Sequence, residues 1–144
     1  MNRKVSVAPM MDCTDRHERY FLRLISKNTL LYTEMIVDEA INRGDKKKLL
    51  EFNINEKPVA LQIGGSSPKL LAETCKIGED FGYDEINLNL GCPSKKVEKN
   101  KFGACLMKEP NLVADCLTEM QASTNLPVTI KTRIGYDSVD DYEN

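Results

Sequence analysis

Long hydrophobic runs are missing from this sequence of 144 residues. The apolar stretches span only a few residues, whereas a helix that crosses a membrane needs about 20. The N-terminal segment also lacks the apolar region and the cleavage site of a secretory signal peptide. These absences exclude a membrane-spanning protein and predict a cytoplasmic one. The length suits a single domain.

The cysteines and histidine do not have the pattern of a disulfide framework or a metal site. The sequence has 5 cysteines, an odd number, and no export signal, so a disulfide framework is not expected. No two cysteines are spaced as C-x-x-C, and His17 is the only histidine. We therefore predict no metal site. Four cysteines are interpreted as small buried hydrophobic residues, namely Cys13, Cys75, Cys105 and Cys116.

A strongly basic composition is also absent. The formal net charge is -2, whereas a free-standing nucleic-acid-binding domain is expected to be strongly basic. The positive charge is nevertheless concentrated at one place, because Lys95, Lys96, Lys99 and Lys101 lie within seven residues of each other. Such a run is typical either of a solvated surface or of a surface that meets phosphate groups.

Strand-like and helix-like segments alternate along the chain. Short apolar segments closed by proline, glycine or polar residues predict strands, and apolar residues at helical spacing after a cap residue predict helices. Residues 45–48 and the long segment from 91 to 109 are interpreted as surface connections. The predicted strands are residues 5–9, 30–33, 59–63, 85–90 and 127–132, and the predicted helices are residues 16–26, 38–43, 68–81 and a segment that begins at Pro110.

This alternation predicts right-handed βαβ units around a parallel sheet, either open and doubly wound or closed as a (β/α)8 barrel. No G-x-G-x-x-G motif follows the first predicted strand, so the dinucleotide-binding open sheet lacks its main signature. Polar residues instead gather after several strands, which is typical of a barrel active site. They are Asp12, Glu34, Gln62, Asn89, Cys92, Lys131 and Arg133.

A complete barrel of this kind typically has ~250 residues and eight strands, and this sequence supplies about five predicted strands. We therefore predict an α/β fold, a (β/α)8 TIM barrel truncated to about the first five β/α units. Residues 1–144 would form the N-terminal part of the barrel. The outer edges of the first and fifth strands would then be exposed.

Five sequence motifs carry a resemblance to a known family. Residues 86–104, INLNLGCPSKKVEKNKFGA, resemble the signature of the tRNA-dihydrouridine synthases. The segments VAPMMDCTDRHERYFLR, LLYTEM, VALQIGGS and VTIKTRIG are similar to the family's flanking motifs and occur in the family's order. The first two are most similar to the A-type bacterial subgroup. The resemblance runs from about Ser6 to Gly135.

The resemblance implies FMN as the cofactor, NADPH or NADH as the electron donor, and tRNA as the substrate. In complete members the last three barrel strands supply a histidine and the loops for the flavin phosphate, and a C-terminal helical domain grips the tRNA. We expect these parts to be absent from residues 1–144. The implied cofactor-binding residues are Pro9, Met10, Met11, Gln62 and Lys131, Asn89 would contact the target uracil, and Arg133, Lys95 and Lys96 are further candidates for tRNA contact.

The implied reaction needs a proton donor. Reduction of the 5,6 double bond of uracil requires a hydride, here from reduced FMN, and a proton from the protein. A free cysteine has a pKa of about 8.5, so its thiol is mostly protonated at neutral pH, whereas a carboxyl group would already be ionised. Cys92 is therefore the expected proton donor in the reduction of uridine to dihydrouridine in the D-loop of tRNA.

Two other functions stay open at this point. Another FMN barrel oxidoreductase could act on a free pyrimidine, or the chain could be a non-catalytic truncated remnant. The 144-residue chain alone is expected to be inactive or very weak and to hold flavin poorly. The sequence leaves the oligomeric state undetermined.

Overall fold

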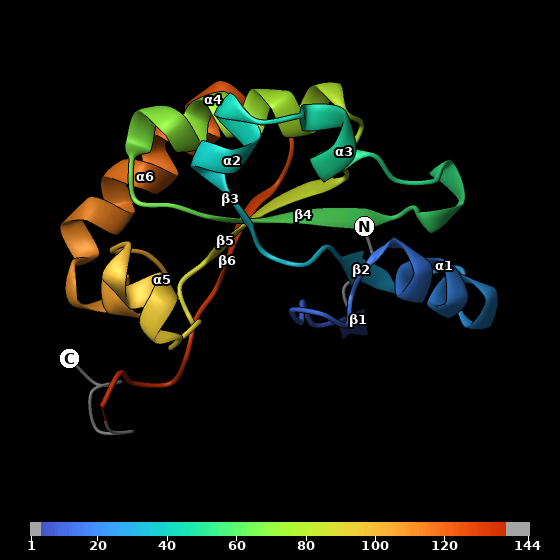
Figure 1. Ribbon diagram of the computed structural model, residues 1–144, viewed down its shortest axis with the longest axis horizontal. Coiled ribbons are helices and arrows are strands. Elements are labelled where there is room, and N and C mark those ends of the chain that lie inside the picture. Colours follow the sequence, from blue (N-terminus) through green and yellow to red (C-terminus); the bar gives the residue numbers. More distant parts are fainter. Residues whose placement is uncertain (1–3, 138–144) are drawn as a thin grey trace.

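The computed structural model describes residues 4–137, and its strands form one parallel sheet (Figure 1). The strand order is β1-β2-β4-β5-β6, and the short strand β3 pairs with the end of β4. Every strand pairing is parallel. The strands are β1 (Ser6–Val7), β2 (Leu30–Tyr32), β3 (Ile36–Val37), β4 (Val59–Gly64), β5 (Glu85–Asn89) and β6 (Val128–Lys131).

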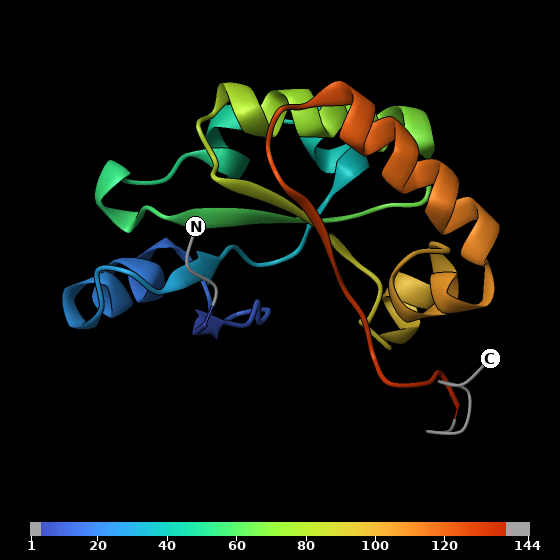
Figure 2. The same ribbon diagram turned by 180° about the vertical axis from the view of Figure 1, so that it is seen from behind.

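Helices connect the strands except β2 and β3, which are joined by a short loop, and α4 and α6 lie side by side over one face of β4 and β5 (Figures 1 and 2). This arrangement is a parallel α/β half-barrel, consistent with part of a TIM barrel, so the predicted fold class is confirmed. The helices are α1 (Arg16–Ile25), α2 (Asp38–Arg43), α3 (Lys46–Leu50), α4 (Pro68–Asp80), α5 (Lys95–Lys99) and α6 (Pro110–Ser123), with 3-10 turns η1 (Ile54–Glu56) and η2 (Gly103–Lys108).

The hydrophobic core lies between the sheet and these helices. Leu61 of β4 and Ile86 of β5 are fully buried and belong to one continuous cluster with residues of α4 and α6. The helix α4 approaches the sheet closely at Gly78, where an added Cβ would lie 2.6 Å from Ile86 Cδ1. A larger side chain at position 78 would therefore push α4 away from the sheet.

Local cap residues bound the helices. Asp15 caps the N-terminus of α1, and its Oδ1 accepts hydrogen bonds from the backbone N–H groups of residues 17 and 18, both at 2.9 Å. Ser67 caps α4 just before Pro68 at the first helical position. Gly82 follows α4 with a φ of 86°, a left-handed conformation that favours glycine.

Two predicted connections are helical instead. Residues 45–48 overlap α3, which is capped by Asp45 and anchored by fully buried Leu50. The lysine-rich segment after β5 forms α5, anchored by buried Val97, and then η2, which buries Leu106. Residues 45–48 are mostly exposed, as expected of a surface connection, although they are helical. The prediction of a connection without helices after β5 was wrong, because isolated apolar residues surrounded by charged ones give too weak a periodic signal to predict a helix.

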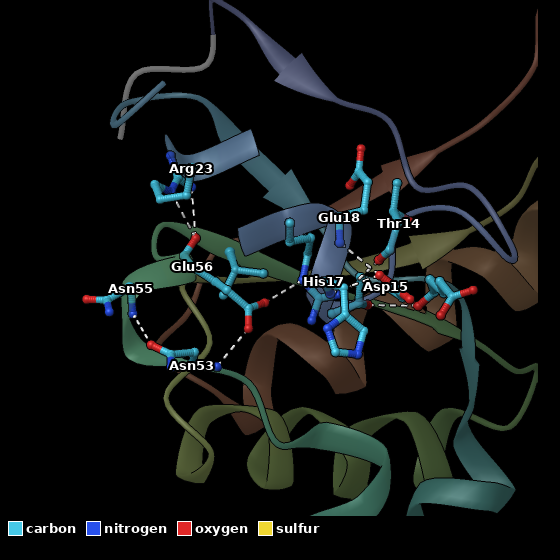
Figure 3. A network of polar contacts seen from close by, with 12 residues as sticks. Thr14, Asp15, His17, Glu18, Arg23, Asn53, Asn55 and Glu56 are labelled. Atoms are coloured by element: carbon cyan, nitrogen blue, oxygen red, sulfur yellow. Dashed lines mark hydrogen bonds and ion pairs between the residues drawn. The ribbon is translucent and has the colours of Figure 1, made fainter. Parts of the chain in front are cut away.

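The helix α1 does not bury its apolar side. Tyr20, Phe21, Leu24 and Ile25, which the helical spacing places on one face, are between 44% and 70% exposed. Arg19 and Arg23 are buried instead. Arg23 points toward Glu56 of η1 (Figure 3) and donates to its backbone oxygen, and Arg19 donates to the Glu56 side chain. Each arginine also donates to a backbone oxygen next to an end of α1.

The two outer strands are open on one side. Within residues 4–137, β1 pairs only with β2 and β6 pairs only with β5. This matches the expected open edges of the first and fifth predicted strands. No helix in the same part of the chain is long and apolar enough to cross a membrane.

Candidate active site at the carboxyl ends of the strands

Alternate residues of β5 carry polar side chains on the sheet face that points away from the core. Side chains alternate across a strand, so Ile86 and Leu88 pack in the core while Glu85, Asn87 and Asn89 share the opposite face. These three polar residues are buried, with exposed fractions of 0%, 2% and 7%. Barrel interiors are usually filled by branched apolar residues, so this polar face distinguishes the site.

The polar side chains form one hydrogen-bonded network across three strands. In the sheet register Gln62 of β4 lies opposite Asn87, which lies opposite Thr129 of β6. Gln62 Nε2 donates to Asn87 Oδ1 at 2.8 Å, and Asn89 Nδ2 donates to Gln62 Oε1 at 3.0 Å. Asn87 Nδ2 donates to Thr129 Oγ1 at 2.9 Å. Because each amide orients the next, the network fixes the side chains at the strand ends.

This network also fixes the turn that carries Cys92. Asn89 Oδ1 accepts hydrogen bonds from the backbone N–H groups of Gly91 at 3.1 Å and Cys92 at 2.9 Å. On the other side, the Cys92 carbonyl accepts from the N–H of Ala104 at 3.0 Å. Gly103 has a φ of 74°, and an added Cβ there would lie 2.8 Å from the Cys92 carbonyl oxygen. The half-buried thiol of Cys92 therefore belongs to a residue whose backbone N–H and carbonyl groups are both hydrogen-bonded.

The two predicted cations of β6 have different positions. Lys131 is the last residue of the strand, lies opposite Asn89 and is exposed. Arg133 lies beyond the strand, so strand alternation does not make it point the same way as Lys131. It approaches the cysteine turn instead, because a Cβ on Gly91 would lie 3.4 Å from Arg133 Cγ. Arg133 and Cys92 both line a cavity of 200 Å³.

The predicted flavin-facing loop follows β1 and is tightly turned. Met10 O accepts hydrogen bonds from the N–H groups of Thr14 at 2.9 Å and Cys13 at 3.2 Å, and Met10 N donates to Thr14 Oγ1 at 3.0 Å. Met10 and Met11 are 57% and 53% exposed, and Pro9 before them is half-buried. The loop thus presents two thioether side chains at the carboxyl end of β1.

A larger cavity of 590 Å³ lies beside the cysteine turn. Of the predicted site residues, Cys92, Met11 and Lys96 line it, and Lys95 is exposed on the same short helix as Lys96. In the described part of the chain its lining does not include Gln62, Asn89 or Lys131. Sequence reasoning missed several other lining residues, including Met35, Asp38, Asn100 and Phe102.

The remaining cysteines differ in burial. Cys75 and Cys116 are fully buried, as predicted. Burial raises the pKa of Cys75 to about 12 and the pKa of Cys116 to about 11. Burial also raises the pKa of half-buried Cys105, whose Sγ lies 3.2 Å from the Phe102 carbonyl oxygen. Cys13 is exposed, so its interpretation as a buried hydrophobic residue was wrong, because it lies in the turn after β1.

We expect these differences to control thiol alkylation. With iodoacetamide at pH 8, Cys13 should react first, and Cys75 and Cys116 should react only after unfolding, because the thiolate is the reactive species and burial suppresses it. Peptide mass spectrometry after timed quenching measures each site. Early modification of Cys75 in the folded chain would contradict the packing of α4 against the sheet.

The described residues therefore define an α/β half-barrel with a polar site at the carboxyl ends of its strands, where a cysteine, amides and cations gather. In residues 4–137 no group of three or more His, Cys, Asp or Glu side chains could hold a metal ion. The family model for dihydrouridine synthase (Dus) matches residues 6–144. The chain belongs to this family.

Relatives of this family include the tRNA-dihydrouridine(20/20a) synthase of Synechocystis sp., which is 61% identical over 140 residues. The proteins of the same name from Vibrio cholerae and Escherichia coli are each 58% identical, over 142 and 140 residues. Each alignment covers 97% of this chain but only 40% to 42% of the relative. The chain thus spans less than half the length of these curated relatives.

Proposed function

We propose that this chain supplies the cysteine-bearing part of a tRNA-dihydrouridine synthase that reduces uridine at positions 20 and 20a of tRNA, as the names of its relatives indicate for those proteins. Residues 1–144 act as the N-terminal part of a flavin-binding barrel. The observation that carries the proposal is the double role of Asn89, which contacts Gln62 and also holds the Cys92 turn. This proposed reaction takes place in the cytoplasm, where tRNA is modified.

The residues present fit FMN as the cofactor. A flavin ring has hydrogen-bonding groups at one edge and negative charge when reduced, and the strand ends offer buried amides beside an exposed lysine. Gln62 and Lys131 would hold the polar edge, and the loop from Pro9 to Met11 would support the ring. FMN, when bound, would supply hydride transfer with NADPH or NADH as the electron donor.

Asn89 is suited to recognise the target base. An asparagine amide has two N–H donors and one carbonyl acceptor. Within residues 4–137, its carbonyl oxygen is occupied by two backbone N–H groups, and only one hydrogen bond from Nδ2 is made, to Gln62. The second N–H is therefore available for a carbonyl oxygen of uracil. Lys131 on the neighbouring strand would stabilise negative charge close to the same base.

Cys92 would deliver the proton to the uracil ring. Its Sγ–H bond would break as a new C–H bond forms, and the resulting thiolate would take a proton back from solvent. Arg133, which lines the same small cavity as Cys92, would contact the tRNA. Lys95 and Lys96 on α5 would meet the tRNA phosphates nearby. Membership of the dihydrouridine synthase family favours tRNA over a free pyrimidine as the substrate.

A chimera tests this proposal. Joining residues 1–144 to the remaining C-terminal part of the Synechocystis relative should yield a protein that binds FMN and forms dihydrouridine at positions 20 and 20a. The two parts should fit because the corresponding regions are 61% identical. Mass spectrometry of nuclease-digested tRNA, after incubation with NADPH, measures the product and its position.

The 144-residue chain alone serves as the comparison. We expect it to bind less than stoichiometric FMN and to form little dihydrouridine, because the remaining loops of the flavin site are supplied by the added part in the chimera. A yellow chain with stoichiometric flavin would contradict this expectation. A chimera that folds and binds FMN but leaves tRNA unchanged would favour the non-catalytic alternative.

A further inference from the structure

Cys92, Met11 and Lys96, which have roles in the reaction proposed above, line one part of the larger cavity, whereas its other lining residues have no role there. In the described residues, Cys92 and Met11 line this cavity, but the base-reading Asn89 and the cation Lys131 do not. Cys92 also lines the smaller cavity that contains Arg133. Cys92 therefore borders two cavities, one on each side of the cysteine turn.

The walls of this cavity combine apolar surface with one buried carboxyl group. Met35 and Phe102 supply thioether and aromatic surface, on which a flat base can pack. Asp38 is only 3% exposed, and its Oδ1 accepts a hydrogen bond from the N–H of Glu39 at 2.7 Å. Its Oδ2 lies over Gly65, where an added Cβ would be 2.2 Å away. The absence of a side chain at position 65 thus makes room for this acceptor.

The rim of the cavity carries positive charge and amide groups. Lys96 and Asn100 of the α5 region line it, and Asn100 Nδ2 donates to the Lys96 carbonyl at 2.7 Å. Ser66 and Ser67, just before the first residue of α4, line the cavity as well. An apolar pocket with a few fixed polar groups is typical of a small-molecule or base-binding site, and 590 Å³ lies within the usual size range.

We propose that this cavity binds the uracil base of the nucleotide that neighbours the one being reduced. The inference rests on the proposed function, in which two consecutive positions, 20 and 20a, are substrates. While one uridine lies at Cys92, the other occupies the cavity on the far side of the cysteine turn. Single-stranded RNA is commonly recognised in this way, with unstacked bases held in separate pockets.

Asp38 gives the cavity its preference for uracil. The carboxylate oxygen Oδ2 is a hydrogen-bond acceptor and can accept from N3–H at the centre of the uracil edge, whereas cytosine has an acceptor at N3 and would have to shift in the cavity to bring its 4-amino donor to Oδ2. Substitution with asparagine keeps the shape. Because Oδ1 would still accept from the N–H of Glu39, the amide would then present an N–H donor toward Gly65. Asp38→Asn should therefore remove the preference for uracil, because an N–H donor can pair either with N3 of cytosine or with a carbonyl oxygen of uracil.

Titration of the ¹⁵N-labelled chain with the dinucleotides UpU and CpC tests this inference. UpU should shift the backbone amide signals of Gly65 and Asn100, and it should bind about tenfold more tightly than CpC, because one mismatched buried hydrogen bond has an effect of this size. Asp38→Asn should abolish this difference in affinity. Asp45→Asn is the matched control, because Asp45 also accepts a backbone N–H at a helix start but lies outside the cavity lining.

Equal affinity for UpU and CpC in the unmodified chain would overturn the inference, as would the absence of binding at millimolar concentrations. The inference would also be overturned if Asp38→Asn kept the preference for uracil. The same holds if NADPH, but not UpU, shifted the backbone amide signals of Gly65 and Asn100. These measurements need neither flavin nor turnover. An inactive chimera with an intact UpU preference would therefore refute the proposed reaction alone, and an active chimera without that preference would refute only the cavity assignment.

Discussion

Replacing Cys92 with alanine in the chimera should lower the rate of dihydrouridine formation by about 10²- to 10⁴-fold, the usual contribution of a positioned general acid. The fold should be retained, because the turn is held by backbone hydrogen bonds to Asn89 and Ala104 that do not use the thiol. FMN content and tRNA affinity should therefore change little. Single-turnover kinetics with pre-reduced enzyme measure the chemical step directly.

Cys105→Ala is the matched control for Cys92→Ala. Cys105 lines the same small cavity, and burial raises the pKa of its thiol. Its Sγ lies against the Phe102 carbonyl, so it has no part in the proposed proton transfer. The control should keep the full rate. Unchanged turnover in Cys92→Ala, or an equal loss in both variants, would remove Cys92 from the mechanism.

The elements and the strand ends could be predicted from sequence because the signals are local. Proline and glycine bound the apolar segments, and Asp15 and Ser67 cap helices through nearby backbone groups. Parallel strands also bring their carboxyl ends to one edge of a sheet. For that reason Gln62 could be expected at one site with Asn89 and Cys92, although it lies 27 residues before Asn89, and the structure joins them through hydrogen bonds.

The missed features depend on contacts between distant segments. The helix α5 is anchored by Val97 in a run of lysines, and its burial is decided by the core around it rather than by its own pattern. Asp38 resembles any other acidic residue at a helix start, and only the fold places it in a cavity wall beside Gly65. The periodicity of α1 indicates two faces but not which of them meets the rest of the protein.

The buried face of α1 depends on Glu56, which lies 37 residues further along the chain than Arg19. Arg19 Nε lies 2.8 Å from Glu56 Oε2, and the two side chains are only 6% and 2% exposed. Glu56 Oε1 also accepts from the N–H of Asn53 at 2.7 Å. The carboxylate therefore satisfies a buried cation and a backbone donor at once.

Glu56→Ala should lower the free energy of unfolding by about 3–5 kcal/mol, because removal of one partner leaves the other charge buried without compensation. Urea denaturation of the chain, followed by circular dichroism, measures the change in the free energy of unfolding, provided that its slope against urea concentration is the same for both proteins. The control is Glu39→Ala, which removes an exposed ion pair with Arg43 at 3.9 Å. That change should cost about 0.5 kcal/mol or less.

A double substitution separates the charge from the packing in this region. In Arg19→Met with Glu56→Leu, both charges are replaced by apolar side chains of similar size, so much of the stability lost in Glu56→Ala should return. Arg23 should keep its contacts, because it donates to the backbone oxygens of Glu56 and Pro58. A loss of less than about 1 kcal/mol in the free energy of unfolding for Glu56→Ala would mean that the ion pair between Arg19 and Glu56 is exposed to solvent. The helix α1 could then rotate so that its apolar residues face the protein.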